Sequence, residues 1–194
     1  MQFEEMGNMS GKTLMLLPGT CCNYQTNFGP VIPKLSEKYH LICVNYDGFD
    51  GSDLIFPDMI TVTEKIEKYI IDNYGGRLDG AIGSSLGSTF VGQLIMREKV
   101  HIDHGIFGSP DLDQSGKFSA WLQSKLVVPL LTGFTKNEKK RNKMGEKYLQ
   151  RYKKYFRNPD IREFDMQHEQ WLFSGEKYAE PVLRAIDEFM EMSV

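Results

Sequence analysis

The sequence predicts an α/β fold in which helices flank a mostly parallel sheet. Short apolar runs alternate along the chain with longer segments that carry apolar residues at helical spacing. The runs are apolar throughout, which is typical of parallel strands that are covered on both faces. Strands and helices that alternate in this way form βαβ units, and such units build a parallel sheet. With 194 residues, the chain is long enough for one domain with a core of its own.

The first part of the chain carries the predicted elements up to residue 75. Its clearest strand is the apolar run at residues 13–17, which a proline and a glycine close. A later helix is expected to open at Thr61, with Glu64 three residues on as a capping box, and to end at Gly75. The other elements of this part are a short strand at residues 3–6, a helix through Phe28, Ile32 and Leu35, and a strand at residues 41–46.

A G-x-S-x-G motif, Gly83-Ser84-Ser85-Leu86-Gly87, follows a predicted strand at residues 78–82. Apolar residues at helical spacing come after it, and a further strand is expected at residues 103–108. A strand, a sharp turn and a helix are the context that a nucleophile elbow requires. The turn lifts the serine hydroxyl above the sheet edge, and the first helical residue offers a free backbone N–H to a developing oxyanion. Ser85 is therefore the candidate nucleophile, and a plain Gly/Ser-rich turn is the alternative.

The composition changes after residue 113. An apolar helical stretch at residues 121–131 precedes a strongly basic, aromatic-rich run at residues 136–157. This pattern predicts a helical insertion, whose basic face is solvated or guides an anionic substrate. The strand pattern resumes at residues 170–175, and a last helix is expected to start with Pro181. The predicted organisation is a core at residues 1–113, a helical cap at residues 114–168, and a core strand and helix at residues 169–194.

These residues together resemble the α/β-hydrolase family of serine esterases and lipase-like enzymes, closely over residues 13–113 and loosely beyond. The turn Pro18-Gly19-Thr20 is similar to the family's oxyanion loop. The resemblance implies one oxyanion N–H at Thr20 or Cys21 and a second at Leu86. Residues 45–52 match the family's D-x-x-G-x-G-x-S in part, with an asparagine for the aspartate and an aspartate for the second glycine.

The family order of catalytic residues is Ser, then an acid, then a His after the final strand. By position, the acid is Glu180, or its neighbour Glu176, after the penultimate strand, or Asp111 after the strand at residues 103–108. Each of these carboxylates is equally compatible with an ordinary solvated residue. The resemblance therefore leaves the acid open between the two positions.

No histidine follows the last predicted helix, so the chain is expected to be short at its C-terminus. His40, His101 and His104 belong to the amino ends of predicted strands, on the side opposite to Ser85. His168 is the remaining candidate, as a base recruited from the cap. Two interpretations follow. The protein is a serine hydrolase that acts on a carboxylic ester or related acyl substrate, or it is a truncated or degenerate, non-catalytic relative that at most binds a small apolar ligand under the cap.

The charge and composition of the chain limit the kinds of partner that it is expected to bind. The formal net charge of −3 gives no signal for nucleic acid, and no apolar run approaches the ~18 residues of a membrane span. Residues 1–12 are not a signal peptide, and three cysteines (Cys21, Cys22 and Cys43) fit neither a disulfide framework nor a zinc site. We therefore expect a cytoplasmic protein with a small-molecule ester or acyl substrate, no metal and no cofactor. A missing last strand would leave an exposed sheet edge through which copies of the chain could pair.

Overall fold

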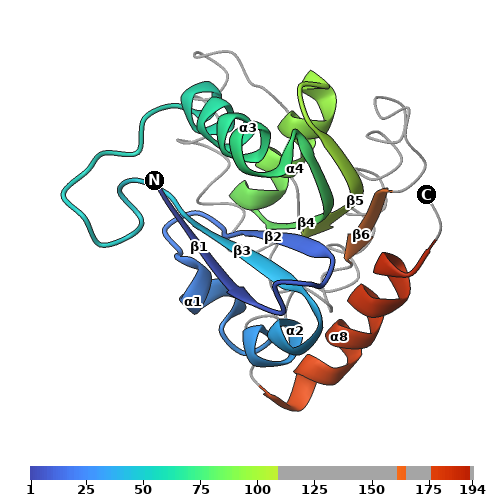
Figure 1. Cartoon of the computed structure of the whole chain (residues 1–194). Helices are drawn as coiled ribbons and strands as arrows, with labels where there is room; N and C mark the ends of the chain where they lie inside the picture. The colour runs from blue at the N-terminus through green and yellow to red at the C-terminus, as the bar shows by residue number, and fades with distance from the viewer. Residues whose placement is uncertain (109–160, 165–175, 193–194) are drawn as a thin grey trace, which may run out of the picture. The chain divides into compact units, whose positions relative to one another are not determined.

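The computed structural model describes residues 1–108, 161–164 and 176–192 (Figure 1). In this part of the chain, six strands form one sheet in the order β1-β3-β2-β4-β5-β6. All neighbouring strands are parallel except β1, which runs antiparallel to β3. The strands are β1 (Gln2–Gly7), β2 (Thr13–Leu17), β3 (His40–Asn45), β4 (Arg77–Ser84), β5 (His101–Gly108) and β6 (Ile161–Phe164).

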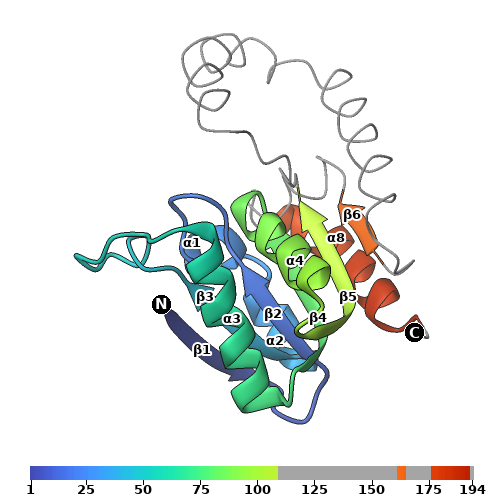
Figure 2. The same ribbon diagram turned by 90° about the horizontal axis from the view of Figure 1, so that it is seen from above.

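Helices cover both faces of this sheet (Figure 2). Helices α1 (Tyr24–Phe28), α2 (Ile32–Lys38) and α8 (Glu176–Met190) lie on one face, and α3 (Met59–Tyr74) and α4 (Leu86–Arg97) lie on the other. The predicted α/β class with a mostly parallel, helix-flanked sheet is therefore confirmed. No helix in the described ranges combines the length and the apolar character that crossing a membrane requires.

The start of α3 differs from the prediction, whereas its end agrees. Asp58 is the N-cap, because its Oδ1 accepts the backbone N–H of Thr61 at 2.9 Å. Thr61 is thus the third helical residue, and its hydroxyl donates back to Asp58 Oδ2 at 2.6 Å. The predicted cap at Thr61 was wrong by three residues, since the preceding aspartate already satisfies the first turn. Gly75 ends the helix with φ 61°, as expected of a left-handed C-cap.

The last part of the sheet also differs. Strand β6 pairs with β5 and lies within the range predicted for the cap, so residues 161–164 belong to the sheet. Helix α8 begins at Glu176, five residues before the Pro181 at which the sequence placed its start. The residues before this proline include alanine, lysine and glutamate, which favour helix on their own. The strand predicted at residues 170–175, and the cap up to residue 160, lie outside the described residues.

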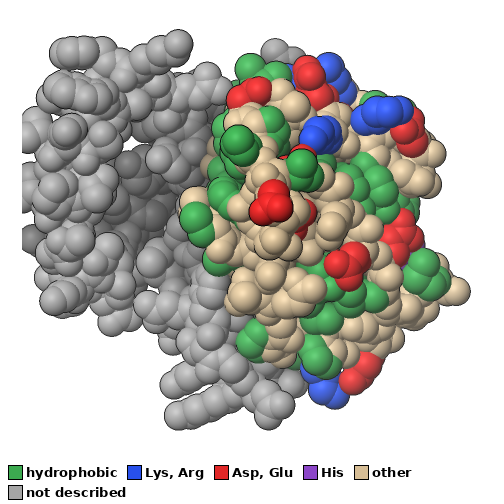
Figure 3. Space-filling model, turned by 90° about the vertical axis from the view of Figure 1, so that its left-hand side faces the viewer, with side chains coloured by type: hydrophobic (Ala, Val, Ile, Leu, Met, Phe, Trp, Pro, Cys, Tyr) green, Lys and Arg blue, Asp and Glu red, His purple; other side chains and the backbone are tan. Residues whose placement is uncertain are grey.

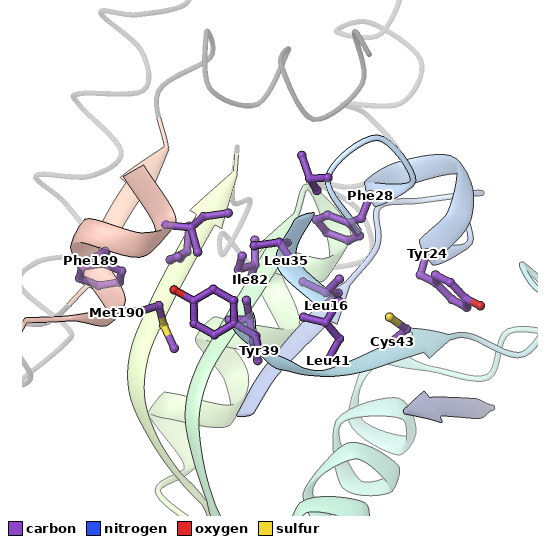
Figure 4. Close-up of a cluster of buried hydrophobic side chains, with 14 residues drawn as sticks. Leu16, Tyr24, Phe28, Leu35, Tyr39, Leu41, Cys43, Ile82, Phe189 and Met190 are labelled. Carbon is purple, nitrogen blue, oxygen red and sulfur yellow. The ribbon is translucent and has the colours of Figure 1, made fainter. Parts of the chain in front are cut away.

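An apolar core fills the space between the sheet and helices α1, α2 and α8 (Figure 4). Met190 of α8 lies directly against the sheet, because a Cβ atom built on Gly80 would come within 2.7 Å of its sulfur. Tyr39 donates from its hydroxyl to Asp187 of the same helix at 2.6 Å. Burial and this carboxylate raise the pKa of Tyr39 well above its usual value. These contacts fix the C-terminal half of α8 on the sheet.

Strand β1 forms one edge of the described sheet and carries two glutamates. Glu4 accepts the Tyr24 hydroxyl at 2.6 Å, and Glu5 accepts the Tyr69 hydroxyl. The hydrogen bond from Tyr69 is the main reason that the pKa of Glu5 is lowered. Figure 3 shows this side of the molecule, where acidic, basic and apolar side chains are interspersed. Charged side chains along an edge strand disfavour pairing with a second chain.

Candidate active site

Ser85 lies at the turn between β4 and α4, and its backbone is strained. Its φ is 47° and its ψ is −109°, a conformation that side chains with a Cβ rarely adopt. Among the described residues, only Cys21, Ser85 and Glu98 have a positive φ without being glycine. The Ser85 side chain is exposed and caps no backbone group of α4. Its N–H donates to the Gly108 carbonyl at 2.7 Å, which ties the turn to the end of β5.

The two glycines of the motif are required by close packing. A Cβ atom on Gly83 would lie 2.3 Å from backbone atoms of Gly87 and Ser88. A Cβ atom on Gly87 would lie 1.8 Å from the carbonyl oxygen of Leu17. Both contacts are far below van der Waals distance, and both involve backbone that moves only with its strand or helix. The strand–turn–helix unit therefore closes only with glycine at positions 83 and 87.

Ser88 connects the turn to the ends of two strands, a role that the sequence did not reveal. The residue is fully buried, and its Oγ accepts the Gly108 N–H at 2.9 Å. Its hydroxyl proton goes to the carbonyl oxygen of Gly83 or Gly108, at 2.6 and 2.8 Å. One side chain thus joins the first turn of α4 to the ends of β4 and β5. This network fixes the height at which Ser85 stands above the sheet.

The loop after β2 comes up beside Ser85. A Cβ atom built on Gly19 would lie 3.5 Å from Ser85 Cβ and 3.4 Å from the Ser84 carbonyl oxygen. The chain then turns, because the Cys22 N–H donates to the Gly19 carbonyl at 3.2 Å and Cys21 takes a φ of 58°. Residues 19–22, called the oxyanion turn below, bring Thr20 to the elbow at an exposed position.

Three backbone N–H groups at this place have no acceptor within the described chain. They belong to Thr20, Cys21 and Leu86. Leu86 is the first residue of α4, where the helix itself provides no acceptor. The predicted donors therefore lie on the two segments that flank Ser85.

Two buried asparagines fix the ends of this loop, and sequence reasoning missed both. Asn27 is fully buried in α1, and its Oδ1 accepts the Gly19 N–H at 2.7 Å. Asn45 ends β3, and its Oδ1 accepts the Tyr24 N–H at 3.0 Å. An asparagine beside an apolar run signals such a role, because a buried polar side chain needs a partner. The partner itself cannot be deduced from the spacing.

Four aromatic side chains pack together near the carboxyl end of β3. Tyr46 follows β3 and packs against Phe90 of α4, with ring centroids 5.1 Å apart. Phe49 and Phe56 stack on each other at 5.0 Å, and both meet the Tyr46 ring edge-on. Complete burial raises the pKa of Tyr46 well above its usual value, so its hydroxyl stays protonated. These rings therefore form an aromatic cluster between the segment after β3 and α4.

The described histidines are held away from Ser85. His40 is the first residue of β3 and its Nε2 lies 3.0 Å from Glu5. His104 lies four residues before the end of β5, about 13 Å from it, and contacts the Asp79 carbonyl at 2.9 Å. His101, at the start of β5, pairs with Asp103 at 2.9 Å. The expectation that the histidines lie at the amino ends of strands is confirmed for His40 and His101, whereas His104 lies in the middle of β5. His168 lies outside the described residues.

Of the candidate acids Glu180 and Asp111, the structure describes only the backbone of Glu180. Asp111 lies outside the described residues. Glu180 lies within α8 instead of in a loop, and its side chain is outside the described part. Helix α8 runs opposite to β5 (Figure 2), and Glu180 precedes Met190 by ten residues, about 15 Å. Its backbone therefore lies toward the carboxyl edge, where Ser85 stands. Across the described ranges, no three His, Cys, Asp or Glu side chains gather so as to hold a metal ion.

Comparison with known proteins gives structural matches only. No family model matches the sequence, and no curated protein matches it. A putative α/β hydrolase family protein from Desulfitobacterium hafniense is similar in structure, with a TM-score of 0.57 and 17% identity over 68% of this chain and 54% of that chain. The core has an α/β-hydrolase-like fold.

Two further solved structures show the same likeness more weakly. A lipase-esterase related protein from Clostridium acetobutylicum has a TM-score of 0.49 and 20% identity, over 56% of this chain and 46% of that chain. An esterase from a Rhodococcus species has a TM-score of 0.48 and 18% identity, over 56% of this chain and 41% of that chain. The chain thus spans about half the length of the solved structures that it matches. At 17% identity, the likeness to the Desulfitobacterium hafniense protein shows the fold alone.

Proposed function

We propose that the protein is a serine hydrolase that cleaves a carboxylic ester or related acyl substrate with Ser85 as its nucleophile. The observation that carries this proposal is the conformation of Ser85, a strained and exposed residue at the carboxyl edge of the sheet. Backbone strain of this kind persists in proteins mainly where a function needs it. Ligands of open α/β sheets bind at this edge, and an α/β-hydrolase sheet presents its serine there.

In the proposed reaction, Ser85 Oγ attacks the substrate carbonyl carbon while a base removes the hydroxyl proton. The negative charge that develops on the carbonyl oxygen is held by the N–H of Leu86 and by that of Thr20 or Cys21. Collapse of the tetrahedral intermediate expels the alcohol, which takes the proton from the base. Water then hydrolyses the acyl-serine by the same steps and regenerates Ser85.

His168 is our candidate for the base. The three described histidines are engaged elsewhere, at hydrogen-bond distance from Glu5, Asp103 and the Asp79 carbonyl. The carboxylate that orients the base is Glu180 or Asp111. Loss of a triad member leaves only about 10³–10⁴-fold catalysis over water. His168→Ala should therefore remove most of the esterase activity, and Glu180→Gln and Asp111→Asn should identify the acid.

The test is covalent labelling with a fluorophosphonate, read by mass spectrometry. The wild-type chain should gain one phosphonyl group, and Ser85→Ala should gain none. Ser52→Ala is the matched control, because Ser52 is also an exposed loop serine but lies outside the elbow. Hydrolysis of p-nitrophenyl acetate should follow the same pattern. An unlabelled wild-type protein, or equal labelling of Ser85→Ala, would refute the proposal.

A second candidate function is non-catalytic binding of a small apolar ligand. The engagement of all three described histidines away from Ser85 favours this reading. It predicts that the wild-type chain is not labelled and still binds a fluorescent fatty-acid analogue. Saturable binding of this analogue, together with absent labelling, would support it over hydrolysis.

A further inference from the structure

The oxyanion turn has four backbone N–H groups, of which two donate hydrogen bonds and two do not within the described residues. The Gly19 N–H donates to Asn27 Oδ1, and the Cys22 N–H donates to the Gly19 carbonyl. The two groups between them, on Thr20 and Cys21, have no acceptor in the described ranges. The bonded groups fix the peptide planes at the two ends of the turn. They therefore fix the direction of the two free N–H groups between them.

The side chain that fixes the first peptide plane is itself held firmly. Asn27 belongs to α1, whose N-cap Asn23 accepts the Thr26 N–H at 2.8 Å while Thr26 Oγ1 hydrogen-bonds back to the Asn23 backbone. The next residue, Phe28, is a fully buried member of the core (Figure 4). Asn45 holds the start of the same helix through the Tyr24 N–H. The turn is thus attached to a short helix that three independent contacts immobilise.

Asn27 satisfies one buried donor and leaves another unsatisfied. Its Nδ2 is buried and has no hydrogen-bond partner within the described residues. A buried amide with an unsatisfied donor is unfavourable, and a leucine of similar shape would avoid it. What leucine cannot provide is the acceptor for the Gly19 N–H, which lies next to Ser85.

We infer that Asn27 is a positioning residue that presets the oxyanion turn by holding the Gly19 N–H. The inference rests on the proposed function of Ser85. With Asn27 in place, the Gly19 N–H is occupied before substrate arrives, and the Thr20 and Cys21 N–H groups are oriented in advance toward the elbow. Without it, the first peptide of the turn rotates freely and the donors must be ordered during the reaction, which lowers the turnover rate.

The experiment compares Asn27→Leu, Asn27→Asp and the control Asp79→Leu. Asp79 Oδ2 accepts the Thr13 N–H at 2.8 Å, so this control removes a side-chain acceptor at the opposite end of β2. Loss of one oxyanion donor typically lowers kcat by about 10²–10³-fold. For Asn27→Leu we expect a smaller fall, about 10–100-fold in kcat and in the rate of fluorophosphonate labelling, with KM changed less than about threefold. Asp79→Leu should leave both values within about twofold once folding is confirmed by circular dichroism.

Asn27→Asp keeps an acceptor for Gly19 and decides the matter if Asn27→Leu does not fold. At low pH the introduced carboxyl is neutral, and the variant should retain most of the kcat that the wild type has at the same pH. As pH rises and the buried carboxyl ionises, its negative charge opposes the developing oxyanion, so the ratio of the variant's kcat to the wild-type kcat should fall. A structural role alone would not change the pH profile in this direction while the melting curve shows a folded protein.

The outcomes separate the two levels of the argument. Wild-type kcat in Asn27→Leu, or a pH profile of Asn27→Asp that matches the wild type, would overturn the role of Asn27 and leave the hydrolase proposal intact. Absence of labelling in the wild-type chain would overturn the hydrolase proposal and the role of Asn27 with it. Slow exchange of the Gly19 amide proton in the wild type, lost in Asn27→Leu, would confirm the hydrogen bond in solution.

Discussion

Replacing Ser85 by glycine should make the protein more stable while removing its proposed nucleophile. With φ at 47°, a residue that carries a Cβ costs about 1–3 kcal/mol, and glycine avoids this cost. Glycine loses about 0.5–1 kcal/mol through the greater freedom of the unfolded chain. The serine side chain is exposed and caps nothing, so little else is lost. The net gain is about 0–2.5 kcal/mol, which for a chain of this length raises Tm by up to about 10 °C.

Ser85→Ala is the control that isolates the Cβ atom. Alanine lacks the hydroxyl but keeps the Cβ and therefore the strain, so its stability should stay within about 0.5 kcal/mol of the wild type. The assay is urea unfolding followed by circular dichroism, together with fluorophosphonate labelling of each variant. Both variants should remain unlabelled, and only the glycine variant should gain stability. A glycine variant less stable than the alanine variant would show that residue 85 is not strained, and the main support for the proposed function would be lost.

Two further predictions concern packing and pH. Gly87→Ala should lower the free energy of unfolding by about 2–3 kcal/mol, because its Cβ would meet the Leu17 carbonyl. Gly105→Ala should stay within about 1 kcal/mol, because its Cβ would meet only side chains, the nearest being the tip of Ile95 at 3.0 Å. Equal effects in urea unfolding would contradict this. Burial raises the pKa of Cys43 to about 12, so the stability that its neutral thiol contributes is present below about pH 8.5 and is lost as pH rises toward 12. From pH 9 to 11 the wild type should therefore lose stability more steeply than Cys43→Ala, by at most about 1.4 kcal/mol per pH unit; parallel curves would argue against it.

The sequence predicted the fold where the signal is local and failed where two local signals compete. The buried strands follow from continuous apolar runs, and the end of α3 follows from Gly75 alone. At the start of α3, however, Asp58 and Thr61 each have the spacing of an N-cap. The structure selects Asp58, whose carboxylate accepts both the Thr61 N–H and the Thr61 hydroxyl. Spacing alone does not decide between two such residues.

Strand β6 shows a second limit. Its four residues, Ile161–Phe164, carry arginine and glutamate in the middle, so they have no apolar run. The segment is a strand because β5 offers its backbone hydrogen bonds along a free edge, with Gly105 and Gly108 opposite the two ends of β6. Pairing of this kind is set by tertiary context, which strand propensity does not contain.

The candidate site divides in the same way. Ser85, Leu86 and Thr20 could be proposed from the sequence because each belongs to a short contiguous motif. Asn27, Asn45 and Ser88 could not, since their hydrogen bonds reach residues 8, 21 and 20 positions away in the chain. Such residues look like ordinary polar substitutions until the elements that they join are brought together.

The structure also separates two meanings of the G-x-S-x-G motif. Gly83 and Gly87 are explained by packing, since any side chain there would collide with backbone, and a non-catalytic protein of this fold would need them equally. Ser85 has no such explanation, because its side chain is exposed and caps no backbone group of α4, and its backbone conformation favours glycine. The support for catalysis therefore rests on one residue, and we expect substitutions at Gly87 and at Ser85 to change stability in opposite directions. Substitution at Gly87 should lower stability and labelling together, whereas glycine at position 85 should raise stability while abolishing labelling.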